Sequence, residues 1–100
     1  MPRRAAEIEG LLQHKFGFSR AMQHGSDHRW YELRLEGLPR ILTMVSHGRG
    51  EIGPVVLGRM ARQLRVRGPF FDGMMSCTRS REEYYRQLRE APYPPFDVLL

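Results

Sequence analysis

Three glycines, Gly48, Gly50 and Gly53, have a spacing that could bind a phosphate group. The spacing G-x-G-x-x-G before a helix is typical of loops that hold the pyrophosphate of a dinucleotide. That use requires a second parallel strand after the helix, ending in an acidic residue that binds the ribose. In its place the chain has VRGPFFDGMM, where a Gly-Pro pair and a further glycine interrupt any buried strand. We therefore predict no dinucleotide cofactor. The glycines either supply turns only, or leave backbone N–H groups at the helix start to hold an RNA phosphate.

The histidines and the single cysteine are the other side chains that could carry chemistry. Cys77 is alone, so it can form neither an internal disulfide nor a cysteine-only zinc site. His14 and His24 have no second histidine or carboxylate at a metal-binding spacing, and we predict no metal. His28 and His47 remain as candidates for proton transfer, because the pKa of an imidazole lies near neutrality. The alternative for each is a surface residue that hydrogen-bonds within its turn or loop.

The composition is that of one folded, basic domain. The 100 residues are 41% hydrophobic and 10% aromatic, and the net charge is +5. Residues 1–67 hold 12 of the 16 Lys and Arg residues but only 6 of the 11 acidic residues. The positive excess therefore lies where a polyanion would bind, if it is more than a solvated surface. No apolar run approaches the roughly 20 residues of a membrane span, and no apolar segment follows the two N-terminal arginines, so we expect a cytoplasmic protein.

Hydrophobic periodicity predicts the elements that position these residues. Apolar residues at helical spacing predict a first helix over about 4–15, broken at Gly17. Alternating patterns then predict three short antiparallel strands, over 18–23, 28–35 and 39–46. A turn is expected over 24–27, and Glu36-Gly37 fits a two-residue hairpin loop. The middle strand places one set of side chains on each face: Tyr31, Leu33 and Leu35 on one, and His28, Trp30, Glu32 and Arg34 on the other.

The second half of the chain predicts two further helices. Pro54 suits the first position of a helix whose apolar stripe faces the core and whose arginines lie away from it. The stripe is Leu57, Met60, Ala61 and Leu64, and the arginines are Arg59, Arg62 and Arg65. The stretch RGPFFDG is expected to break the chain, and Ser80-x-x-Glu83 predicts a capping box for a last helix over about 80–91. A Pro-rich extended tail follows.

This order predicts an α+β fold of the double-stranded-RNA-binding type, α-β-β-β-α, with a three-stranded antiparallel sheet packed by two helices. We expect that domain over residues 1–67. Residues 68–100 then form an appended extension with one helix, packed on the same domain.

Two motifs and their order are similar to the HicA family of toxin ribonucleases from prokaryotic toxin–antitoxin modules. The motifs are GSDHRWYEL, a Gly-Ser turn with a histidine at the head of a strand, and VSHG followed by the helix EIGPVVLGRMARQL. The likeness covers about 5–66. It implies that His28 is the catalytic histidine, that messenger RNA is cleaved without a metal or cofactor, and that a HicB-like antitoxin restrains the activity.

The chemistry suits this assignment. Cleaving RNA without a metal requires a group that takes the proton of the 2′-hydroxyl and one that protonates the leaving 5′-oxygen. His28 could do either near neutral pH, with His47 as a second candidate. Cations and a stacking ring would hold the substrate. The RNA-binding candidates are Lys15, Ser26, Arg29, Trp30, Arg49, Arg59 and Arg62.

The departure from the family is the extension over 68–100, since HicA proteins typically end soon after the second helix. It could cover the sheet, dock on an antitoxin, mediate a homodimer or occlude the site. A catalytically inactive RNA-binding or protein-binding module on the same fold is therefore the alternative function.

Overall fold

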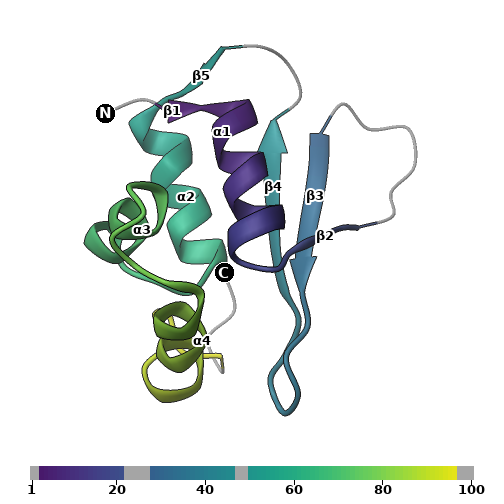
Figure 1. The fold of residues 1–100 in the computed structure, drawn as a ribbon, viewed down its shortest axis with the longest axis vertical. Helices are drawn as coiled ribbons and strands as arrows, with labels where there is room; N and C mark the ends of the chain where they lie inside the picture. Colours follow the sequence, from purple (N-terminus) through teal and green to yellow (C-terminus); the bar gives the residue numbers. More distant parts are fainter. Residues whose placement is uncertain (1–2, 22–27, 47–49, 97–100) are drawn as a thin grey trace.

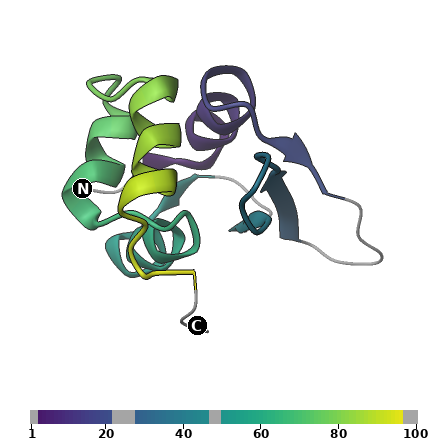
Figure 2. The same ribbon diagram turned by 90° about the horizontal axis from the view of Figure 1, so that it is seen from below.

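The chain forms an α+β fold in which the helices lie to one side of a three-stranded antiparallel sheet (Figure 1). The computed structural model describes residues 3–21, 28–46 and 50–96, and for His28 and Ser46 it describes the backbone only. A view turned by 90° shows the helices grouped together beside the strands (Figure 2). The predicted fold class, with its helix, three strands and second helix in that order, is confirmed.

The first helical segment consists of α1, Ala5–Gly10, continued without a break by a π-helical stretch, η1, Leu11–Lys15. It forms because Ile8 and Leu12 recur on one face and are completely buried, as is Phe16 directly after it. The segment ends at Gly17, which has a φ of +80°, a conformation that L side chains rarely adopt. The helix expected over about 4–15 is thus confirmed.

The sheet has the strand order β2-β3-β4, with β2 at Ser19–Arg20, β3 at His28–Leu33 and β4 at Ile41–Ser46. Tyr31 pairs with Thr43, and Leu33 pairs with Ile41. These four side chains face the helices and are buried, as the alternating pattern predicts. On the opposite face, Trp30 pairs with Met44.

The hairpin between β3 and β4 turns at the expected residues. Leu38 donates its backbone N–H to the carbonyl of Leu35 at 3.1 Å, and Gly37 between them has a φ of +83°. The turn expected over 24–27 lies outside the described residues.

A second, two-stranded sheet was not predicted from the sequence. β1, Arg3–Arg4, pairs antiparallel with β5, Glu51–Ile52. The pairing places the start of α1 beside the residues that lead into α2, and the N–H of Ala5 donates to the carbonyl of Gly50. Strands of two residues carry too little alternation to be recognised in a sequence.

Three helices follow: α2 at Pro54–Gln63, α3 at Gly68–Met75 and α4 at Arg81–Glu90. α2 begins at its proline, and its apolar stripe is buried, both as predicted. The helix α4 begins with the predicted capping box, in which the Ser80 hydroxyl accepts from the Glu83 N–H and the Glu83 carboxylate accepts from the Ser80 N–H. No helix among the described residues is long and apolar enough to cross a membrane.

The expectation that RGPFFDG breaks the chain is wrong, because residues 68–75 form α3, and the extension therefore has two helices. Pro69 lies in the first turn of α3, where its missing N–H costs no helical hydrogen bond. Phe71, Met74 and Met75 then recur at the spacing i, i+3, i+4 and are buried. Burial of this face outweighs the low helix propensity of the glycines at 68 and 73.

The extension shares one hydrophobic core with the rest of the chain. Tyr84 of α4 is completely buried, packs edge-on against Phe16, and donates its hydroxyl to the carbonyl of Leu64 at 3.0 Å. Tyr85 donates to the carbonyl of Phe16 at 2.8 Å, and its hydroxyl lies 2.5 Å from where a Cβ would be on Gly17. α4 therefore closes the core beside the end of the first helical segment.

Candidate functional site

The backbone of His28 opens the central strand of the sheet and pairs with Ser46 of β4. The nearest candidate along the chain is Arg29, and Trp30 follows it on the same strand. Of the other predicted site residues, Ser26, His47 and Arg49 lie outside the described residues, as does the side chain of His28. The described side chains nearest to His28 along the chain are those that follow it on β3.

Arg29 extends to the helix side of the sheet, where it meets Glu9 of α1. Its Nε donates to Oε2 of Glu9, and its Nη2 donates to Oε1 at 2.8 Å, so the guanidinium binds the carboxylate with two donors. The hydroxyl of Tyr31 also donates to Oε2 of Glu9, at 2.7 Å. Alternation explains the arrangement, because residues 29 and 31 lie on the same face of β3.

A second cation lies beside Tyr31. The guanidinium of Arg20, on β2, lies 5.7 Å from the centre of the Tyr31 ring, within the range of a cation–π contact. Arg20 pairs with Tyr31 across the two strands, which brings the two side chains to the same face. We call Glu9, Arg20, Arg29 and Tyr31 the Glu9 cluster. It holds two arginines and one carboxylate, so its formal charge is +1 when Tyr31 is neutral.

The protonation states of the cluster follow from these contacts. Burial disfavours the charged form of Glu9, but hydrogen bonds from Arg29 and Tyr31 outweigh it and lower the pKa of the carboxyl below its ordinary value. Burial, aided by the hydrogen bond to Glu9, raises the pKa of Tyr31 to about 12. The hydrogen bond to Glu9 also raises the pKa of Arg29 above its ordinary value. At neutral pH the cluster thus contains a carboxylate, two guanidinium groups and a neutral phenol.

Trp30 and Lys15 are half-buried and lie in different surroundings. Trp30 is on the sheet face opposite to the Glu9 cluster, with Met44 as its cross-strand partner. The ammonium of Lys15 lies 5.4 Å from the centre of the Phe16 ring, and the Lys15 carbonyl accepts a hydrogen bond from Arg81. The structure therefore does not bring Trp30 and the Glu9 cluster together on one face.

Arg59 and Arg62 are exposed on α2, as predicted, and neither makes a hydrogen bond or an ion pair with any residue in the described ranges. Arg65, which was expected on the same face, differs. It follows the end of α2 with a φ of +66° and donates to the carbonyls of Pro94 and Pro95. Two guanidinium groups on α2 thus face solvent without a partner in the described ranges, while the third arginine holds the C-terminal segment.

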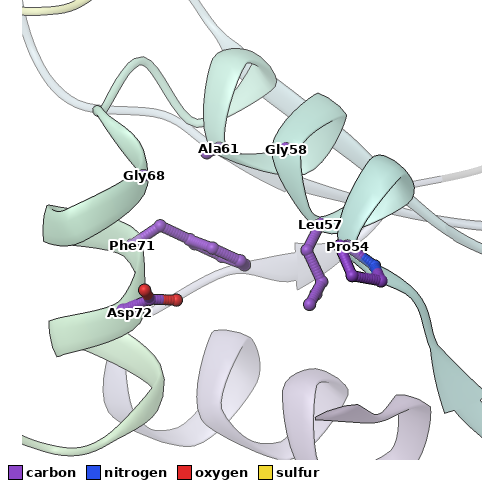
Figure 3. A pocket seen from close by; sticks show the side chains of 7 residues that line it. All are labelled: Pro54, Leu57, Gly58, Ala61, Gly68, Phe71 and Asp72. Atoms are coloured by element: carbon purple, nitrogen blue, oxygen red, sulfur yellow. The ribbon is translucent and has the colours of Figure 1, made fainter. Parts of the chain in front are cut away.

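A cavity of about 210 Å³ lies between α2 and α3 (Figure 3). Phe71 of α3 extends across it toward Leu57 of α2, and the carboxylate of Asp72 lies beside Phe71. Pro54, Gly58, Ala61 and Gly68 complete the lining. No group of three or more His, Cys, Asp or Glu side chains in the described part of the chain could hold a metal ion.

Comparison of the chain with family models, with curated proteins and with solved structures finds no match.

Glu9 and Tyr31 were not among the residues singled out from the sequence. The sequence pattern places Glu9 within the first helix and Tyr31 on one face of the middle strand, and it gives neither residue a functional role. One signal was present, since Arg29 occupies an inward position of an alternating strand and a charged residue there requires a partner. Which carboxylate would supply it depends on how α1 packs, and the spacing of the residues does not contain that information.

Proposed function

We propose that the protein binds RNA and cleaves it without a metal, with His28 as the catalytic residue, in the manner of HicA-type toxin ribonucleases. One observation carries the proposal: the histidine of the Gly-Ser-x-His motif begins the central strand of an α-β-β-β-α fold. It is also followed directly by an arginine whose orientation is fixed by a carboxylate. The resemblance in sequence and the order of elements agree on that position.

The reaction needs two proton transfers. A base removes the proton of the 2′-hydroxyl, the 2′-oxygen forms a bond to phosphorus, the bond from phosphorus to O5′ breaks, and an acid protonates O5′. His28 serves as one of these groups, because an imidazole is near half-protonated around neutral pH. The Glu9 cluster, on the helix side of the sheet, adds a net positive charge that favours the approach of a polyanion.

Contacts further from the reaction centre hold the RNA. Arg59 and Arg62 project from α2 without an acidic partner among the described residues, and so can contact phosphates. Trp30 presents part of its indole on the open face of the sheet, where an unpaired base could stack. The proposal includes action in the cytoplasm and restraint by a HicB-like antitoxin, which the resemblance implies.

The test is cleavage of a labelled single-stranded RNA in the presence of EDTA by the wild type and by His28→Gln. The matched control is His14→Gln, because His14 is an exposed histidine on the first helical segment. We expect loss of cleavage of at least about 100-fold for His28→Gln, the usual contribution of a general acid or base, and full activity for His14→Gln. Equal cleavage by the two variants removes His28 from the mechanism.

A second candidate is a non-catalytic RNA-binding module on the same fold. One observation favours it: two donors of Arg29 are already engaged by Glu9, which reduces the positive charge next to His28. This candidate predicts RNA binding that weakens steeply with salt while the RNA stays intact after long incubation. Binding and cleavage measured on the same labelled RNA separate the two.

A further inference from the structure

The three-stranded sheet has one covered face and one open face, because the described helices lie on the same side of it (Figures 1 and 2). The uncharged residues of β3 and β4 that face the helices are at most 4% exposed, and they are Tyr31, Leu33, Ile41, Thr43 and Val45. The described residues that alternate with them are all partly exposed, and they are Trp30, Glu32, Leu42 and Met44. Solvent therefore reaches the second face along both long strands.

The middle of this open face is apolar. Trp30 lies opposite Met44, and Leu42 follows in the next row, where it pairs with Glu32. Ala21 joins the row of Trp30 from the β2 side, since its N–H donates to the Trp30 carbonyl at 2.8 Å. A partly exposed aromatic ring beside aliphatic side chains is the kind of surface on which the bases of a single-stranded nucleic acid stack.

A group of three charges follows the apolar rows. Nη2 of Arg34 and Nη1 of Arg40 lie 3.4 and 3.3 Å from the same carboxylate oxygen, Oε1 of Glu32. The side chains of the two arginines are 71% and 48% exposed, whereas that of Glu32 is 21% exposed. The group has a formal charge of +1. Because exposed ion pairs are weak, the two guanidinium groups can exchange this carboxylate for a phosphate.

We propose that a single strand of RNA crosses the open face of the sheet, with an unpaired base stacked on Trp30 and with phosphates bound by Arg34 and Arg40. RNA as the ligand rests on the proposed function, and the path across the sheet goes beyond it. His28 begins β3 two residues before Trp30, about 7 Å along a strand. The stacked base therefore belongs to a nucleotide close to the reacting phosphodiester, and the two arginines hold the strand further along.

The size of the face favours RNA over a protein partner. Two strands of six residues, with β2 adding two more, form a face of roughly 300 Å². A stable protein interface takes about 800 Å² from each partner. Sheets of RNA-binding modules stack only about two or three bases, which need less area. The positive charge that follows the apolar rows also favours a polyanion.

The same features favour an unpaired strand over a duplex. In double-stranded RNA the bases are stacked on one another, so their faces are closed to an indole. A single strand can turn a base toward Trp30 while its phosphates reach Arg34 and Arg40. We therefore expect weak binding of double-stranded RNA at this face, although the order of the elements is that of a double-stranded-RNA-binding domain.

The fluorescence of Trp30 tests the path directly, because Trp30 is the only tryptophan of the chain. The probe is a short 2′-O-methyl RNA of mixed sequence, which has no 2′-hydroxyl proton to lose and so stays intact when it is bound. We expect saturable quenching of the tryptophan by the single strand, and much less by the same strand annealed to its complement. Fluorescence anisotropy of a labelled strand measures binding in parallel.

Trp30→Leu removes the ring but keeps an apolar side chain on the face, and circular dichroism verifies that the variant folds. We expect binding of the labelled strand to weaken about tenfold, as for loss of one stacked base. Trp30→Phe should recover part of the affinity because it restores a ring. Tyr93→Leu is the matched control, since Tyr93 is an exposed aromatic residue outside the sheet, and its binding should equal that of the wild type.

The charges are tested in both directions. Glu32→Gln releases Arg34 and Arg40 from their carboxylate, so we expect several-fold tighter binding at low salt. Replacing both arginines by glutamine should weaken binding several-fold and reduce its salt dependence. Arg86→Gln is the control, because Arg86 is an exposed arginine on α4, and it should change neither.

The outcomes separate this path from the ribonuclease activity. Binding without quenching of Trp30, or equal binding by Trp30→Leu, overturns the path even where unmodified RNA is cleaved. Quenching by the 2′-O-methyl strand without cleavage of unmodified RNA supports the path and removes the activity. Preference for the duplex overturns the path. So does self-association of the chain that Trp30→Leu abolishes, because a second copy would then cover the face.

Discussion

The hydroxyl of Tyr31 donates a 2.7 Å hydrogen bond to the carboxylate of Glu9 and so joins the central strand of the sheet to α1. The same carboxylate binds the guanidinium of Arg29. These three side chains form a polar connection between α1 and the sheet, and Arg29 directly follows the proposed catalytic position on β3. Their contribution to the stability of the fold can be tested separately from any activity.

Replacing the Glu9 carboxylate should destabilise the fold. Glu9→Gln keeps the side-chain shape but removes the charge that compensates Arg29, and the Glu9 side chain is only 12% exposed. We expect a loss of about 1–3 kcal/mol in the free energy of unfolding, between the values for exposed and buried ion pairs. Urea denaturation measures it, with Glu7→Gln as the control because Glu7 is exposed in the first turn of the same helix. Equal stability of the two variants would contradict a structural role for the cluster.

The same residue predicts a change of stability in acid. The pKa of Glu9 is lowered in the folded state, so its contribution is complete above the ordinary value of 4.5 and is lost as the pH falls through the lower folded value. Glu83, whose pKa the Ser80 N–H of the capping box lowers, acts in the same direction. The difference in unfolding free energy between the wild type and Glu9→Gln should therefore shrink below about pH 4.5. A difference that is constant from pH 7 to strongly acidic solution would exclude this linkage.

Tyr31 predicts the opposite dependence in alkali. Its folded pKa of about 12 exceeds the ordinary value of 10.0, so its contribution is complete below pH 10 and is lost as the pH rises toward 12. Buried Tyr84 and half-buried Tyr85 have raised pKa values and add to the loss. Tyr31→Phe should thus lose less stability than the wild type over this range. Denaturation curves at several alkaline pH values measure it, and parallel losses would show that the phenol of Tyr31 is not protected.

The contact between α2 and β4 allows a double-mutant cycle. Oε1 of Gln63 accepts from the hydroxyl of buried Thr43 at 2.7 Å and from the N–H of Met44 at 3.3 Å. Gln63→Ala leaves the Thr43 hydroxyl without this acceptor, at a cost of about 1–3 kcal/mol. In the Thr43→Val background the same change should cost less, since no hydroxyl remains to be satisfied. Additive losses would show that the two side chains do not depend on each other.

The elements that carry a long apolar pattern could be predicted from the sequence, and those fixed by other segments could not. Leu57, Met60, Ala61 and Leu64 recur at helical spacing over about two turns, so α2 can be recognised from the sequence. α3 was missed because two glycines and a proline within eight residues are typical of a loop. What makes it helical is burial of Phe71 and Met74 against the rest of the core, an effect of tertiary packing that local propensity does not contain.

The residues of the candidate site also fall into those that could be placed from the sequence and those that could not. Arg59 and Arg62 were placed correctly on the exposed face of α2, because helical periodicity alone decides that orientation. Arg29 was expected to face a substrate phosphate. In the structure it instead binds Glu9 of α1, which lies 20 residues earlier in the chain. The cavity between α2 and α3 could not be predicted, because the sequence pattern did not predict α3.

The rings of Phe16 and Phe18 lie 5.7 and 6.3 Å from that of Tyr84, centre to centre. A premature stop codon or frameshift after the second helix would strip this cover from both phenylalanines. The product would then be an aggregation-prone fragment rather than a smaller folded domain, and chaperones and proteases would act on it. Removal of α4 is therefore expected to lower the yield of folded protein rather than to release an independent domain.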